Sequence, residues 1–449
     1  MKKIVFFIAI TIISCSRATG QSCLPQGITF TSQAQINNFQ ANYPGCTIIE
    51  GNVTIQGDGI SNLNGLSVLT SIGGYLGIFN NAILTNLIGL GNLASIGGSL
   101  LIGDYNTYGN PVLINLTGLE NLTSVGGNIW VIGNNSLTSL TGLNNLTAIG
   151  GNLQIGGNDY NSGNPSLTNL SGLDNLTSIG GYLRIYFNQA LNNLIGLESL
   201  TSIGGDLSIS HCQALTSMTG LNNLTFIGGS FYVGLTYYGG NASLTSLTGL
   251  ENLTSIGGSL RIEYNKNLTS LTGLAGLVAI GGDLRIYDND ALTSLTGLDN
   301  IAAGSMNNIE IRYNDSLSYC EVQSICDFLS FPIGTIIISQ NAPGCNSPAE
   351  VLAACETLGV ESAVQAEGFS FFPHPFDDQL TLKFCMNTTG MAVAEVFNTM
   401  GQRLAVLLNK KLPVGTHEIS CNAGHLAAGI YFLRLQAGKD PAIRKIIKN

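Results

Sequence analysis

The residues of this sequence that could carry out chemistry are few and scattered. Asp288 and Asp290 stand two positions apart, a spacing at which carboxylates could bind calcium or act as the acid and base of a polysaccharide-active enzyme. Either site needs further acidic ligands or a basic partner, yet Lys266 is the only lysine between residues 21 and 360. The chain has no G-x-S-x-G, H-E-x-x-H or phosphate-loop motif. The sequence therefore predicts a protein that is not an enzyme, with no catalytic residue and no cofactor.

Cysteine is the other residue type that could be reactive. No C-x-x-C spacing is present, so a metal site is not expected. In an exported protein cysteines form disulfides by default, and the four between residues 320 and 355 could pair in three ways. The cysteines predicted to form disulfides are Cys23, Cys46, Cys320, Cys326, Cys345, Cys355, Cys385 and Cys421.

The first twenty residues have the features of a signal peptide. Residues 1–3 include two lysines, residues 4–13 are largely apolar, and residues 18–20 form a small-residue cleavage site. The apolar stretch is too short to span a bilayer, and no later stretch reaches 18 uncharged apolar residues, so no transmembrane segment is predicted. Lipoprotein processing at Cys15 is an alternative. Either route predicts export from the cytoplasm.

Composition narrows the class of protein further. Hydrophobic residues make up 44% of the 449 and charged residues only 10%, which is too apolar for a disordered chain. Residues 21–360 hold 5 basic and 20 acidic residues. Such a segment lacks the basic surface that binding to nucleic acid or an anionic membrane requires.

A short repeat dominates the chain. The string I/V-G-G recurs nine times between Gly73 and Gly281, at intervals of 24, 29 or 30 residues. One unit, residues 268–290, spaces its apolar residues by three and ends in the two-residue alternation of a strand. A unit of 24 residues cannot bury enough apolar surface to fold alone, so the units must stack. The sequence predicts a mainly β, parallel, leucine-rich-repeat-like solenoid of about ten 24-residue coils.

The residue three positions before the leucine that opens each following unit is almost always asparagine. An inward asparagine can bond backbone groups of the adjacent coil through both ends of its amide. We therefore predict a buried asparagine ladder along the axis, with Cys212 as a buried thiol within it. The ladder residues are Asn81, Asn110, Asn134, Asn164, Asn188, Cys212, Asn241, Asn265, Asn289 and Asn314.

Two surfaces could bind a ligand, because aromatic residues and arginine are common in interaction surfaces. The first consists of outward positions on the L-x-I strands, although cross-strand pairing that only stabilises the sheet is the alternative. The second consists of loops that lengthen three coils and carry several tyrosines, although the tyrosines of these loops could simply pack against the solenoid. The candidate strand residues are Trp130, Arg184, Tyr186, Tyr232, Arg261, Arg285 and Tyr287, and the candidate loop residues are Tyr105, Tyr108, Tyr160, Tyr237 and Tyr238.

The repeat unit LxxLxGLxxLxxIGGxLxI..N resembles the receptor L-domain family over roughly residues 47–355. The resemblance implies a right-handed β-helix of the kind that binds ligands in receptor ectodomains. Residues 31–42 are expected to form a short helix inside an N-terminal cap tied by Cys23 and Cys46. Two further helical patches around a last strand, residues 335–339, are expected in a C-terminal cap.

The repeats stop near Phe369, and alternating strands then predict a small immunoglobulin-like β-sandwich. The segments 372–382, 396–404 and 427–435, with the basic tail 444–448, resemble the C-terminal sorting domain of the type IX secretion system. That resemblance implies contact with the type IX machinery and delivery to the cell surface or medium. The predicted division is 1–20 signal peptide, 21–49 N-terminal cap, 50–317 solenoid, 318–358 disulfide-rich cap, 359–369 linker and 370–449 sorting domain.

The sequence favours a non-enzymatic, secreted or cell-surface binding or adhesion protein that presents a solenoid face to a protein or glycan. A structural surface rod is the alternative. Less favoured are a β-helical polysaccharide-active enzyme and an ice-binding protein, the last because threonines such as Thr138, Thr168 and Thr269 form regular columns.

Overall fold

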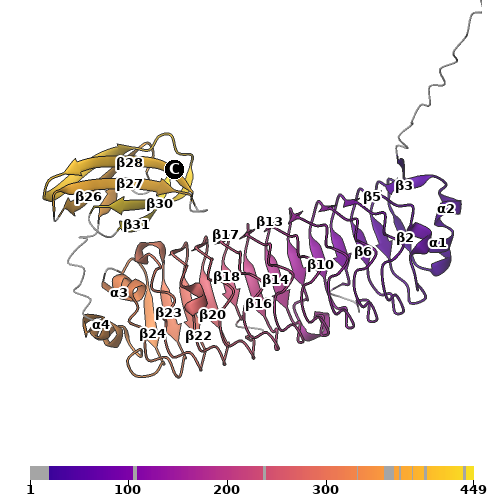
Figure 1. Cartoon of the computed structure of the whole chain (residues 1–449), viewed down its shortest axis with the longest axis horizontal. Coiled ribbons are helices and arrows are strands. Elements are labelled where there is room, and N and C mark those ends of the chain that lie inside the picture. Colours follow the sequence, from indigo (N-terminus) through magenta and orange to yellow (C-terminus); the bar gives the residue numbers. More distant parts are fainter. Residues whose placement is uncertain are drawn as a thin grey trace, which may run out of the picture.

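The computed structural model describes residues 20–104, 109–235, 239–330, 332–357, 369–373, 376–386, 388–398, 402–437 and 441–448. The described residues up to 357 wind into an elongated β-solenoid, and those from 369 onward form a β-sandwich beside its C-terminal half (Figure 1). No helix in these ranges is long and apolar enough to cross a membrane.

One long face of the solenoid is a 13-stranded parallel sheet. The predicted mainly β solenoid is confirmed, but it has about thirteen turns rather than about ten. The three additional turns are those of β2, β4 and β24 at the two ends of the solenoid, where the glycine pair is missing and the repeat cannot be recognised. In order, the strands are β2 (Ile28–Phe30), β4 (Val53–Ile55), β6 (Leu76–Ile78), β8 (Leu100–Ile102), β10 (Ile129–Val131), β12 (Leu153–Ile155), β14 (Leu183–Tyr186), β16 (Leu207–Ser210), β18 (Phe231–Val233), β20 (Leu260–Glu263), β22 (Leu284–Tyr287), β23 (Ile309–Arg312) and β24 (Ile336–Ser339).

Two sheets of short parallel strands form a second edge, and the glycine pair turns the chain from this edge into the long sheet. A Cβ on Gly97 would lie 2.3 Å from the carbonyl oxygen of Gly73, so only glycine lets neighbouring turns stack this closely. The first sheet contains β1 (Gln21–Cys23), β3 (Cys46–Ile49), β5 (Ser71–Ile72), β7 (Ser95–Ile96) and β9 (Ser124–Val125). The second contains β11 (Ala148–Ile149), β13 (Ser178–Ile179), β15 (Ser202–Ile203), β17 (Phe226–Ile227), β19 (Ser255–Ile256) and β21 (Ala279–Ile280).

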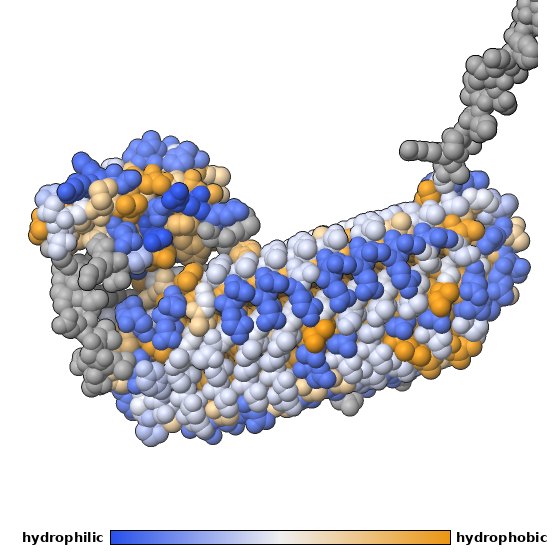
Figure 2. Space-filling model, viewed as in Figure 1, coloured by the Kyte–Doolittle hydropathy of each residue, from blue (hydrophilic) through white to orange (hydrophobic). Residues whose placement is uncertain are grey.

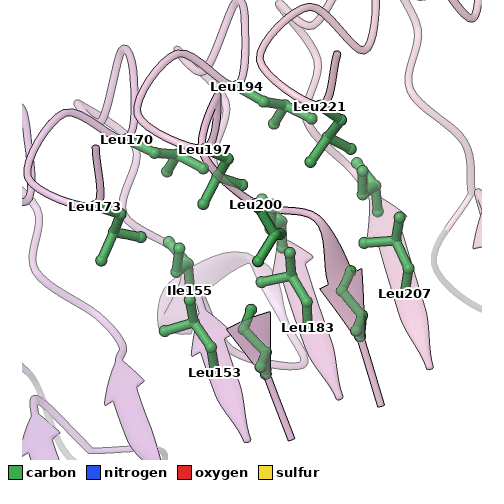
Figure 3. Packing of buried hydrophobic residues seen from close by; sticks show 14 of the residues in the cluster. Leu153, Ile155, Leu170, Leu173, Leu183, Leu194, Leu197, Leu200, Leu207 and Leu221 are labelled. Atoms are coloured by element: carbon green, nitrogen blue, oxygen red, sulfur yellow. The ribbon is translucent and has the colours of Figure 1, made fainter. Parts of the chain in front are cut away.

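The core is a continuous column of leucine and isoleucine. Figure 3 shows how Leu170 and Leu173 of one coil lie beside Leu194 and Leu197 of the next, and all four are fully buried. The three-residue spacing seen in the sequence therefore places one leucine at each bend of the coil. Because each coil lacks a closed core of its own, stability depends on the stacking of neighbours. Short 3-10 turns occur at η1 (Asn64–Leu66), η2 (Tyr160–Ser162), η3 (Thr272–Leu274) and η4 (Ala303–Ser305).

The asparagine ladder is present and fully buried. Asn110 Nδ2 donates to Ile78 O at 2.9 Å, and the backbone N–H of Asn110 donates to Asn134 Oδ1 at 3.1 Å. The pattern continues from Asn314 to Asn341 in the C-terminal cap, a member that the sequence analysis missed. The ladder also crosses the longer coils without a break, as the contact between Asn81 and Asn110 shows.

Both ends of the solenoid are capped and tied by disulfides. Where one short helix was predicted, the N-terminal cap has α1 (Gln33–Asn37), capped by Ser32, and α2 (Phe39–Asn42), and Cys23 bonds Cys46. The C-terminal cap has α3 (Gln323–Ser330) and α4 (Pro348–Thr357). Of its three possible pairings, the structure has Cys320–Cys345 and Cys326–Cys355.

The predicted β-sandwich is confirmed, and its described residues form seven strands in two sheets. One sheet holds β25 (Ser370–Phe372), β26 (Gln379–Met386) and β29 (Gly415–Asn422), and the other holds β28 (Arg403–Leu412), β27 (Gly390–Phe397), β30 (Gly429–Gln436) and β31 (Pro441–Lys448).

The prediction that Cys385 and Cys421, the two cysteines of this domain, form a disulfide is wrong. Strands β26 and β29 are neighbours, but Cys421 lies opposite Leu380 and Cys385 lies opposite Thr416. An offset of five residues along a strand is about 17 Å, and it places the two side chains on opposite faces of the sheet.

Candidate functional site

The parallel register of the long sheet brings the candidate strand residues into two columns. Strand pairing aligns Trp130, Gln154, Arg184, Ser208, Tyr232, Arg261 and Arg285 in one column along the axis. Tyr287 stands in the second column between Glu263 and Arg312. Rows of hydrophilic side chains run along the face of the solenoid that is visible in Figure 2.

These outward positions are less exposed than the alternating pattern suggested. Gln154 is 1% exposed, Glu263 2% and Tyr186 6%. Neighbouring strands lie only about 4.8 Å apart, so long side chains in one column cover one another. Tyr186 in particular donates from Oη to Ser208 Oγ at 2.7 Å. It is a buried pairing residue, and the prediction that it is an exposed anchor is wrong.

The richest group of charges and rings lies on strands β20, β22 and β23. Arg285 Nε lies 3.4 Å from Glu263 Oε1 and 3.2 Å from Glu310 Oε2, so one guanidinium joins three neighbouring coils. The same guanidinium lies over the ring of Tyr287 at 4.6 Å.

Two tyrosines that the sequence analysis missed complete this group. The rings of Tyr264 and Tyr313 flank Tyr287 at 5.6 and 5.0 Å between centroids, and the Arg312 guanidinium lies over Tyr313 at 4.9 Å. Burial and nearby negative charge raise the pKa of the Tyr264 phenol. We call Glu263, Tyr264, Arg285, Tyr287, Glu310, Arg312 and Tyr313 the Tyr–Arg cluster.

The two missed tyrosines share a position with a signal that could have been found. Each immediately precedes a ladder asparagine, and each adopts left-handed φ, 59° for Tyr264 and 58° for Tyr313. Phe187, which precedes Asn188, and His211, which precedes the ladder residue Cys212, also adopt left-handed φ, and their rings lie 4.3 Å apart. Aligning the residue before each ladder asparagine would have revealed this column.

The remaining candidate strand residues form separate pairs along the same sheet. Arg184 lies over Tyr182 at 4.1 Å, and Arg261 lies over Tyr232 at 5.8 Å. Trp130 is half-buried near the N-terminal half. The structure therefore brings Arg285 and Tyr287 together, whereas Trp130 and Arg184 lie several coils away.

The candidate loop tyrosines cannot be placed in the same way. Tyr105, Tyr108, Tyr237 and Tyr238 lie outside the described residues, and only the backbone of Tyr160 is described, at the start of η2.

The side chains considered for catalysis or calcium binding form ion pairs with one another within the solenoid. Lys266 Nζ lies 2.6 Å from Asp288 Oδ1 and 3.0 Å from Asp290 Oδ2. Although burial alone would lower it, hydrogen bonds to both aspartates raise the pKa of Lys266. Among the described residues, no group of three or more His, Cys, Asp or Glu side chains is placed to hold a metal ion.

His211 and Cys212 are adjacent but do not form a catalytic pair. Cys212 is fully buried in the ladder, where desolvation raises the pKa of its thiol to about 12. His211 instead lies against the ring of Phe187. A thiol of this kind is not ionised near neutral pH and is not a nucleophile there.

Comparison with known protein families gives one match in the solenoid and one in the C-terminal β-sandwich. Residues 45–139 match the receptor L domain, and residues 370–449 match the secretion system C-terminal sorting domain. No curated protein matches the chain. Both matched families are non-enzymatic. The chain therefore combines a β-solenoid that matches the receptor L domain over residues 45–139 with a type IX C-terminal sorting domain, which directs it to the cell surface or the medium.

Proposed function

We propose that this protein is a non-enzymatic, secreted or cell-surface binding or adhesion protein whose long sheet binds a protein or glycan. The proposal includes Sec export by the N-terminal segment before type IX translocation. The observation that carries it is the Tyr–Arg cluster, in which three tyrosine rings, two arginines and two glutamates gather on three adjacent strands and the residues that directly follow two of them.

This cluster has the chemistry of a recognition surface. Tyrosine offers a large ring and a hydroxyl at little entropic cost, and arginine offers planar donors, so both recur as binding anchors. The ion pairs of Arg285 and the contact from Arg312 Nη2 to Gln340 Oε1, at 2.9 Å, hold the side chains in place. A preorganised surface loses less conformational entropy when it binds.

A structural surface rod is the second candidate, and one observation favours it. The same ion pairs also link neighbouring coils, so the cluster could serve only to hold β20, β22 and β23 together. The threonine columns have such a role, because Thr269 Oγ1 donates to Thr245 O of the preceding coil at 3.0 Å. Hydroxyls used in this way are less available to order water, which argues against ice binding.

Binding of the full chain to immobilised polysaccharides and matrix proteins would separate the two candidates. A double variant, Tyr264→Ala with Tyr313→Ala, removes the two outer rings of the cluster. Tyr182→Ala is the matched control, because it removes a ring under Arg184 four coils from β22. We expect the double variant to weaken binding at least about tenfold, roughly 1.4 kcal/mol, and the control to bind like the wild type. Equal binding by all three proteins, or no binding to any surface tested, would favour the structural rod.

A further inference from the structure

The sorting domain touches the solenoid at one edge of the sandwich. Strand β31 packs beside η4, and Lys445 Nζ donates to Gly281 O at 3.3 Å. Gly281 belongs to the glycine-pair turns that lead into the long sheet. The sandwich accordingly lies along this side of the solenoid, with β31 as its nearest labelled strand (Figure 1).

Arg444 fits the solenoid because residue 304 is glycine. A Cβ built on Gly304 would lie 2.7 Å from Arg444 Cδ and 3.0 Å from Ile443 O, so the atoms nearest to it all belong to the sorting domain. Burial lowers the pKa of Arg444, while the negative charge of Asp327 on α3 opposes that shift. The contact therefore combines close approach with opposite charge on the two domains.

A second part of the contact is apolar and rests on an exception in the repeat. The residue two positions before the glycine pair is serine or alanine in eight units, but it is Phe226 in the unit of β17. Phe226 lines a hollow of about 380 Å³ together with Ile430 and Phe432 of β30. The one large side chain in this column thus stands where the apolar edge of the sandwich approaches.

We propose that the solenoid carries a docking surface for its own sorting domain, formed by Phe226, Gly281, Gly304 and Asp327, and that docking depends on the covalent link. The matching surface consists of Ile430, Phe432, Arg444 and Lys445. The hollow leaves the apolar groups only partly packed, which makes the contact weak for separate molecules. Joining two modules by a linker gives an effective concentration of about the millimolar range, enough to hold a weak contact closed. Once the linker is cut, the sorting domain leaves and uncovers this edge.

This contact is independent of the proposed ligand-binding face. None of the residues that line the hollow belongs to the Tyr–Arg cluster. A failed ligand screen would therefore leave the docking proposal intact, and the reverse also holds.

Small-angle X-ray scattering of the full chain tests the docked state. Gly304→Leu places a side chain against Arg444, whereas Gly59→Leu, the matched control, enters space with no atom within 4 Å. We expect only Gly304→Leu to shift the pair-distance distribution to longer distances, with an unchanged circular dichroism spectrum. A distribution identical in all three proteins would overturn the proposal.

Phe226→Ser gives a second test that does not depend on Gly304→Leu folding. It restores the residue that most units carry in this column, and we expect the same shift to longer distances. A protease site inserted between residues 359 and 368 tests the role of the link. We expect the cut domains to separate by size exclusion at micromolar concentration, and co-elution would show that docking does not need the tether.

Discussion

Arg285 Nε lies 3.4 Å from Oε1 of Glu263, and the Glu263 side chain is only 3% exposed. Removing the guanidinium would leave a carboxylate in a site that water barely reaches. We expect Arg285→Ala to lower the free energy of unfolding by about 1–3 kcal/mol, measured by urea denaturation. Lys266→Ala is the control, because its ion pairs are exposed and should cost less than about 1 kcal/mol. Equal losses in both variants would contradict this reading of the buried pair.

The asparagine ladder should contribute strongly to stability at each rung. Asn164→Ala removes the donation to Val131 O at 2.9 Å and the acceptor of the Asn134 backbone N–H at 3.1 Å. Buried groups left without partners should lower the free energy of unfolding by about 2–4 kcal/mol. Asn169→Ala, at a half-buried position of the same coil, removes an acceptor of the Ser171 backbone N–H but no ladder contact, and should cost under about 1 kcal/mol. A small loss at Asn164 would mean that water satisfies the ladder groups.

Replacing the ladder cysteine, Cys212, by asparagine should strengthen the hydrogen bonding of the ladder at that coil. Cys212 Sγ lies 3.7 Å from both Ile185 O and Ser210 O, whereas Asn188 Nδ2 reaches the equivalent oxygens at 2.9 and 3.0 Å. We expect Cys212→Asn to raise the thermal midpoint and to add about 1 kcal/mol, while Cys212→Ala lowers both. A less stable Cys212→Asn protein would indicate that the coil cannot accommodate the amide.

Stability should fall at mildly acidic pH because of His211. Desolvation lowers the pKa of this imidazole below its ordinary value of 6.5, so the unfolded chain takes up a proton more readily than the folded one. The stabilisation is present above about pH 6.5 and is lost as the pH falls toward the folded pKa. His211→Phe, with the residue found at Phe187 in the same column, should show a smaller loss between pH 7.5 and 5.5. Identical pH profiles would assign the effect to other groups.

The disulfide pattern can be checked directly by peptide mapping of the unreduced protein. We expect linked peptides for Cys320–Cys345 and Cys326–Cys355 and none joining Cys385 to Cys421. A Cys385–Cys421 peptide in the folded protein would require a different register between β26 and β29.

Much of this fold follows from the sequence because the repeat fixes a register. Once the glycine pairs are aligned, Leu153 and Leu183 must lie in adjacent strands, and the ladder asparagines must meet. The ends were harder, because Ile28–Phe30 and Ile336–Ser339 pair in the same sheet without a glycine pair to mark them.

The site could be predicted only in part. The alternation of side chains along a strand shows which face each one points to, but it does not show how far neighbouring side chains cover it. The sequence placed Arg285 and Tyr287 on the outer face, yet Tyr186 is covered by its neighbours. Tyr264 and Tyr313 escaped notice because a left-handed residue breaks the alternation just beyond the strand. Cys385 and Cys421 were expected to form a disulfide because cysteines of an exported protein do so by default, and that default carries no information about strand register.

Three coils are longer than the rest, yet Asn81 still bonds Asn110 and Cys212 still bonds Asn241 across them. The corner just before each ladder residue therefore accepts additional residues without any loss of the ladder hydrogen bonds between neighbouring coils. Foreign segments grafted at this corner, including epitopes or enzyme-recognition peptides, would inherit a fixed spacing along a rigid support. The solenoid can therefore serve as a scaffold that displays different inserted segments while its own fold stays the same.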